Sequence, residues 1–158
     1  MAITTPNTSL PAEQQLMASL VALMKQEQQV LVNADADGLA ALMPQKTQLV
    51  QQAALLSAGR HKALGAAGFA AAESGMEPWL AANGAPEARA QWQRLLELTA
   101  EAKELNRVNG MLINKQMAHN QAVLNALRTP ADGADPAAVY GPGGQPVAGG
   151  PSRRYVIG

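Results

Sequence analysis

The sequence predicts an all-α protein: an elongated antiparallel helical bundle or coiled coil of about three long helices, followed by a disordered C-terminal tail. Of its 158 residues, 32 are alanine and only 3% are aromatic, a composition that favours helix over strand. Apolar residues recur at spacings of three and four over long stretches, as on a helix with one buried face. The last 29 residues hold five prolines and seven glycines, which do not sustain a helix.

These observations divide the chain into three regions. Residues 1–9 form a flexible N-terminus, residues 10–129 a helical bundle domain, and residues 130–158 a Gly/Pro-rich flexible tail. The first helix is expected to begin near Ser9, with Pro11 and Glu13 in its opening turn. It should end at the Asn-, Asp- and Gly-containing stretch 33–38, which is typical of a turn followed by a new helix cap.

The second helix carries leucines at helical spacing and fades at Gly65. Pro44 interrupts this pattern, and because proline lacks a backbone donor we expect either a short helix ending near Met43 or a kink. Residues 65–85 are rich in small residues and indicate a connector with about one helical turn. Phe69 and Trp79 are expected to anchor this connector to the bundle.

The third helix should run from Pro86 to Arg128, because Thr129 precedes a proline. Forty-three residues would span about 65 Å. One seam steps alternately by three and four, as in a coiled coil. It comprises Trp92, Leu95, Thr99, Ala102, Asn106, Asn109, Ile113, Gln116, Asn120, Val123 and Leu127.

Five asparagines interrupt the second half of this helix, although asparagine is unfavourable inside helices. Asn106, Asn109 and Asn120 fall on the seam, whereas Asn114 and Asn125 lie on the outer side. One interpretation is that the three seam asparagines fix the register of packed helices. The other is an under-packed seam whose apolar residues exchange neighbours for a partner helix: Leu112, Ile113, Met117, Val123, Leu124 and Leu127.

Charge and composition argue for a protein partner. Twelve basic residues balance twelve acidic ones, so no overall field attracts nucleic acid or an anionic membrane. No apolar run approaches the roughly 20 residues needed for membrane insertion. Cysteine is absent, and the N-terminus has no signal-peptide pattern. We therefore expect a cytoplasmic protein.

Catalytic and metal sites find little support, and neither cofactor nor metal is predicted. His61 and His119 lack metal-ligand spacing. Asp35, Asp37 and Gly38 resemble the start of a calcium loop, but later acidic ligands are missing, so a turn and cap fits better. The glycines after Tyr140 follow no strand and precede no helix, which argues against a phosphate-binding loop.

Tyr140 stands alone in a Gly/Pro-rich background. It is either a solvated tail residue or the centre of a short recognition motif, since tyrosine offers a large apolar contact with a polar tip.

The NxxNGxLI run at 106–113, a helix ending near 128 and the YGPGGQ motif at 140–145 together resemble the FlgN family of flagellar export chaperones. Asp35, Leu39, Leu42, Lys46 and Leu49 fit the family's spacing of leucines around a lysine more loosely. The specific part covers about 30 residues, and Pro44 and the connector at 65–85 depart from a simple helical pattern.

This resemblance implies a type III secretion chaperone that binds the terminal helical segments of the hook-filament junction proteins FlgK and FlgL. It would keep them unassembled and deliver them to the export apparatus. The predicted partner-binding residues are Asn106, Asn109, Leu112, Ile113, Met117, Asn120, Val123, Leu124 and Leu127. Tyr140 in the tail is predicted to contact the export gate.

Two alternatives remain at the level of sequence. A generic helical adaptor or regulatory coiled-coil protein shares the same composition. A small enzyme or metal-binding bundle would need inward Glu-x-x-His pairs, which this sequence lacks.

Overall fold

The computed structural model describes residues 4–128, which form four α-helices and one 3₁₀ turn and contain no strand. The elements are α1 (Leu10–Val32), α2 (Ala36–Ala66), η1 (Glu73–Gly75), α3 (Met76–Asn83) and α4 (Pro86–Arg128). The all-α prediction is confirmed, with three long helices and, in addition, the eight-residue α3. The chain divides into two units, residues 1–116 and 117–158.

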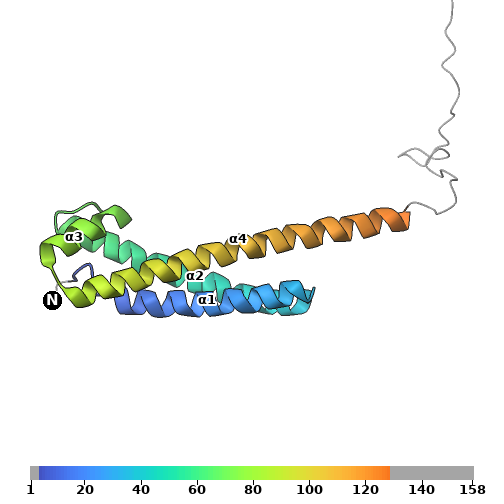
Figure 1. Ribbon diagram of the computed structural model, residues 1–158, viewed down its shortest axis with the longest axis horizontal. Coiled ribbons are helices and arrows are strands. Elements are labelled where there is room, and N and C mark those ends of the chain that lie inside the picture. The colour runs from blue at the N-terminus through green and yellow to red at the C-terminus, as the bar shows by residue number, and fades with distance from the viewer. Residues whose placement is uncertain (1–3, 129–158) are drawn as a thin grey trace, which may run out of the picture. The chain divides into compact units, whose positions relative to one another are not determined.

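In the first unit, α1 and α2 run antiparallel, and α4 up to Gln116 lies alongside them (Figure 1). The short α3 lies at the end of this unit where α2 finishes and α4 begins (Figure 1). The expected bounds of α4, Pro86 and Arg128, are confirmed.

The predicted starts of the first two helices are also confirmed. Ser9 precedes α1, but its hydroxyl donates to Oε2 of Glu13 at 2.8 Å and makes no hydrogen bond to the helix backbone. Asp35 caps α2, because its Oδ1 accepts a hydrogen bond of 2.9 Å from the backbone N–H of Gly38. The turn and cap predicted at 33–38 are therefore present.

Pro44 does not end the second helix, so of the two expected outcomes, a short helix ending near Met43 or a kink, the short helix is wrong. The helix continues through the proline to Ala66, although an internal proline costs about 3 kcal/mol relative to alanine. Two residues later, Lys46 forms a 3.0 Å ion pair with Glu27 of α1, and Leu49 packs against the core. These tertiary contacts hold α2 against α1 beyond the proline and offset its cost.

The connector between the second and third long helices is more ordered than the single expected turn, since it contains both η1 and α3. Gly75 joins the two, and a Cβ there would lie 2.1 Å from the carbonyl oxygen of Ala70, so only glycine permits this close approach. Phe69 and Trp79 both pack on the core, which confirms their predicted anchoring role.

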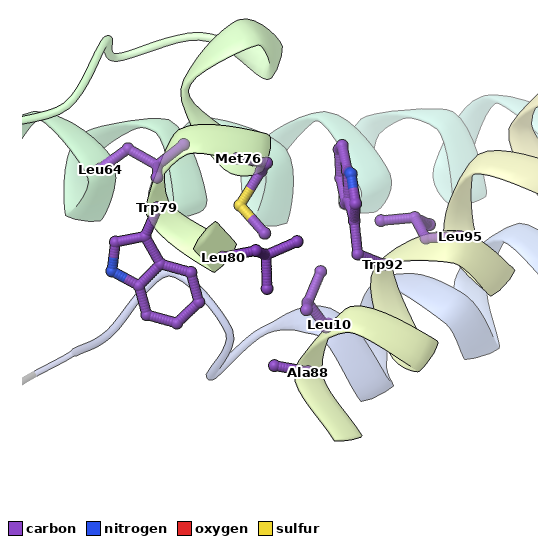
Figure 2. Close-up of a cluster of buried hydrophobic side chains, with 8 residues drawn as sticks. All are labelled: Leu10, Leu64, Met76, Trp79, Leu80, Ala88, Trp92 and Leu95. Carbon is purple, nitrogen blue, oxygen red and sulfur yellow. The ribbon is translucent and has the colours of Figure 1, made fainter. Parts of the chain in front are cut away.

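Two clusters of buried side chains form the core of the first unit. The first joins all four helices and consists of Leu10, Leu64, Met76, Trp79, Leu80, Ala88, Trp92 and Leu95 (Figure 2). The second joins α1 to α4 and consists of Leu20, Val21, Met24, Leu98 and Ala102. Alanine at two of the α4 positions leaves room for the larger side chains of α1 and α3.

Candidate interaction surfaces

The predicted partner-binding residues of α4 are divided between the two units. Asn106, Asn109, Leu112 and Ile113 belong to the first, and Met117, Asn120, Val123, Leu124 and Leu127 to the second. In the first unit the predicted seam is largely buried or half-buried, as at Trp92, Leu95 and Ala102. In the second unit every described residue, from 117 to 128, is exposed. Tyr140 lies outside the described residues.

The exposed end of α4 carries an apolar face. Met117, Val123, Leu124 and Leu127 expose 64%, 45%, 49% and 79% of their surface. At 3.6 residues per turn these four side chains occupy about a third of the helix circumference, and Asn120 lies in the middle of them. We call these five residues the α4 apolar face. Apolar side chains gathered on one side of an otherwise polar helix are typical of a docking surface.

Asn109, in contrast, lies inside the first unit with only 1% of its surface exposed. Its Nδ2 donates to the backbone carbonyl of Met24 at 2.9 Å and to Oε1 of Glu27 at 2.7 Å. Both acceptors lie on α1. If the seam asparagines set the register of the helices, their amides should hydrogen-bond to one position on a facing helix. Asn109 does so.

Glu27 is the centre of this polar cluster and is 1% exposed. Its carboxylate accepts hydrogen bonds of 3.0 and 3.1 Å from Nζ of Lys46. The same ammonium group donates to Oδ1 of the exposed Asn106 at 3.3 Å. A buried carboxylate is tolerated only when it is paired and hydrogen-bonded, and Lys46 and Asn109 provide both. Residues of α1, α2 and α4 therefore meet at one polar contact.

The last described contact between α4 and α1 in the first unit comes from Gln116, whose Nε2 donates to the backbone carbonyl of Leu31. Leu31 is next to the last residue of α1. Leu112 and Ile113, one turn earlier on α4, are half-buried. Part of the surface of each side chain is therefore already covered by other residues of the first unit.

Sequence reasoning missed a second buried polar cluster near the start of α1. Arg60 of α2 donates to Glu13 of α1 from Nε at 3.0 Å and to Glu73 of η1 from Nη2 at 2.7 Å. Its guanidinium carbon lies 4.8 Å from the ring centroid of Trp92, which adds a cation–π contact. Glu13 and Arg60 are 4% and 3% exposed. One arginine thus links α1, α2, η1 and α4.

The pKa values of this cluster reflect its pairing. Burial acts against ionisation of Glu73, but the hydrogen bond and charge of Arg60, and after them those of His61, lower the pKa of Glu73 below its usual value. Burial also opposes the charge on Arg60, yet its hydrogen bonds to Glu73 and Glu13 raise its pKa. Glu73 and Arg60 are therefore both ionised at neutral pH.

A signal for both clusters is present in the sequence. Glu13 follows Leu10 by three residues, and Glu27 follows Met24 by three and precedes Leu31 by four. Both glutamates therefore stand within an apolar stripe, where an unpaired charge is costly. Their partners Arg60 and Lys46 lie on another helix, and only the folded structure identifies them.

A groove of about 660 Å³ opens beside the Arg60 cluster in the first unit. Residues of α2 and α4 form most of its lining, and half-buried Met17 of α1 and residues of η1 and α3 contribute the rest. The wall from α2 consists of small residues, Ala53, Ala54 and Ser57, and the wall from α4 includes Leu96 and Thr99. We call this feature the α2–α4 groove.

Within residues 4–128, no group of three or more His, Cys, Asp or Glu side chains is placed to hold a metal ion. His61 lies 3.2 Å from Glu73, and His119 is exposed on α4. None of the described helices is long and apolar enough to cross a membrane.

Comparison with known proteins identifies one family. The family model described as FlgN protein matches residues 1–148, which is most of the chain. No curated protein and no solved structure matches the sequence.

Proposed function

The chain belongs to the FlgN family of flagellar export chaperones, and from this premise we propose that it is a cytoplasmic type III export chaperone for the hook-filament junction proteins FlgK and FlgL. It binds their terminal helical segments, keeps them unassembled, and delivers them to the flagellar export apparatus. The chemistry is binding, with no bond made or broken.

The observation that carries this proposal is the α4 apolar face. Its four apolar side chains recur at helical spacing and are 45% to 79% exposed. A client helix that covered them would remove each from water, and full burial of such a side chain stabilises by about 1.5–3 kcal/mol. Anchors at spacings of three and four are those by which one amphipathic helix recognises another.

The polar residues around this face suit a reversible contact. Asn120 interrupts the apolar side chains and limits the size of the exposed patch, which opposes self-association. Met117 supplies flexible, polarizable contact area that adapts to clients of different sequence. Arg128 lies beside the face, and no acidic residue occurs between 105 and 128. A client helix with acidic flanking residues is therefore favoured.

Delivery is assigned to the tail. We propose that residues 130–158 act as a flexible chain, for which 29 residues give a root-mean-square length of about 30 Å, and engage the export gate while α4 holds the client. Tyr140 is the proposed contact.

The experiment that tests client binding uses two aspartates on the face. Leu124→Asp with Leu127→Asp should lower affinity for the terminal segment of FlgK at least tenfold, about 1.4 kcal/mol, in isothermal titration calorimetry. The control is Ala118→Asp with Ala122→Asp, which adds the same charge on the opposite side of the helix, where both residues are exposed. Equal loss of affinity in the control, or none in the test variant, would overturn the proposal.

A further inference from the structure

The α2–α4 groove has a shape that fits an additional helix. It belongs to the first unit, whereas the α4 apolar face belongs to the second. On α2, Ala53, Ala54 and Ser57 present small side chains, which allow a neighbouring helix backbone to come close. On α4, Leu96 is 40% exposed and lines the opposite wall. The space of about 660 Å³ between them is open to the surface.

The groove's length can be measured on α4. Trp92 and Lys103 both line it, and they are eleven positions apart on one helix, which corresponds to about 16 Å along the axis. That distance is about three helical turns, so the groove accommodates an apolar stripe of three or four side chains at helical spacing.

The two ends of the groove carry opposite charge. Glu73 and Glu77 line it at the Trp92 end, where their side chains are 56% and 54% exposed. The Glu73 carboxylate is hydrogen-bonded to Arg60, Ser57 and His61. Glu77 accepts one hydrogen bond, from Arg89, so its half-exposed carboxylate keeps lone pairs for further donors. At the far end Lys103 is exposed, and within the described part of the chain it forms no ion pair.

This polarity also selects a direction for a bound helix. The N-terminus of a helix carries partial positive charge and its C-terminus partial negative charge. A helix whose N-terminus lies beside Glu73 and Glu77, and whose C-terminus lies beside Lys103, has both dipole ends matched. A basic side chain in its first turn and an acidic one in its last turn extend the match.

We propose that the α2–α4 groove binds an amphipathic helix of about three turns from a partner protein, parallel to α4, with a basic first turn at Glu73 and Glu77 and an acidic last turn at Lys103. This is a second interaction surface, and it does not depend on the client assigned to the α4 apolar face.

The test uses two fluorescein-labelled synthetic peptides of about 14 residues, enough for nearly four helical turns. Both carry leucines at spacings of three and four on an alanine and glutamine background. The first has lysines in its first turn and glutamates in its last, and the second has these charges exchanged. In fluorescence anisotropy the first peptide should bind the full-length protein about tenfold more tightly than the second.

Substitutions in the groove test whether the peptide binds there. Ala54→Arg and Leu96→Asp, which fill or charge the groove, should each weaken the first peptide about tenfold. Leu55→Asp is the matched control. Leu55 is on α2 next to Ala54 and is 73% exposed, but it does not line the groove. Glu77→Lys with Lys103→Glu should reverse the preference between the two peptides. Circular dichroism checks that each variant is folded.

Four results would overturn the proposal. One is equal affinity for both peptides, and another is binding that survives Ala54→Arg and Leu96→Asp. The third is a groove occupied by a second copy, seen as a dimer in light scattering that Leu96→Asp dissociates. The fourth is loss of peptide binding in the Leu124→Asp, Leu127→Asp variant, because the peptide would then bind the α4 apolar face.

Discussion

Nδ2 of Asn109 on α4 donates a 2.7 Å hydrogen bond to Oε1 of Glu27 on α1, and neither side chain is more than 1% exposed. The pair is completed by Lys46 of α2, whose Nζ lies 3.0 Å from the same carboxylate. A slip of α4 by one turn that brought Leu112 or Ile113 to the place of Asn109 would leave the Glu27 carboxylate without the amide donor. This contact therefore makes one alignment of the three long helices more stable than its neighbours.

The first prediction separates two asparagines that share a face of α4. Asn109→Leu should destabilise the protein by about 1–3 kcal/mol, because a buried carboxylate loses a hydrogen bond. Asn120→Leu should change the free energy of unfolding by less than about 0.5 kcal/mol, because its site is exposed. Urea unfolding followed by circular dichroism measures both. Equal effects of the two substitutions would contradict the structural role of Asn109.

The ion pair between Glu27 and Lys46 yields a second prediction. Lys46→Met alone should cost about 3 kcal/mol or more, since it leaves a buried charge without its partner. Adding Glu27→Gln should recover at least half of the loss, because the neutral amide still accepts a hydrogen bond from Asn109 and no longer needs a counter-ion. The free energies of unfolding of the single and double variants decide the matter. A double variant less stable than Lys46→Met would show that Glu27 does not depend on Lys46.

Acidification should weaken the cluster around Arg60. The pKa of Glu73 is lowered in the folded protein. Its pairing therefore stabilises the fold fully above the usual glutamate pKa of about 4.3, and this contribution is lost as pH falls through the lowered value. The stability difference between the wild type and Glu73→Gln should be constant from about pH 5 to 7 and shrink below about pH 4. A difference that grows on acidification in thermal melts would have the wrong sign for this pairing.

A fourth prediction concerns the tail. Tyr140→Ala should leave the affinity for the FlgK segment unchanged in calorimetry but reduce secretion of FlgK and FlgL from a flagellated host. The reason is the proposed division of roles, in which α4 holds the client and the tail engages the export gate. Tyr140→Phe is the control for the aromatic ring. If Tyr140→Ala leaves both binding and secretion intact, the tail contact is rejected.

Helix boundaries could be predicted from the sequence because the residues that mark them lie close to each boundary. Ser9, Asp35 and Pro86 each stand at a predicted helix start, and each is recognised from a few neighbouring residues. The effect of Pro44 could not be predicted in this way. Lys46 and Leu49 stabilise α2 after the proline, and their contacts are with other helices, which local sequence does not reveal.

The extent of burial along α4 was harder to predict from the sequence. Its apolar periodicity continues from Trp92 to Leu127, but the first of these residues is 3% exposed and the last 79%. Periodicity identifies a face, and only the neighbouring segments determine whether that face is covered. The partners of Glu13 and Glu27 were hidden by distance along the chain, because Arg60 is 47 residues from Glu13.

The most direct measurement of the central claim is methyl NMR of the full-length protein during titration with the terminal segment of FlgK. Shifts or broadening should concentrate at the methyl groups of Met117, Val123, Leu124 and Leu127. Those of the buried Leu20, Val21 and Leu98 should move little. Saturable binding that leaves the four α4 methyl groups unperturbed, or no binding at all, would contradict the proposal that this face holds the client.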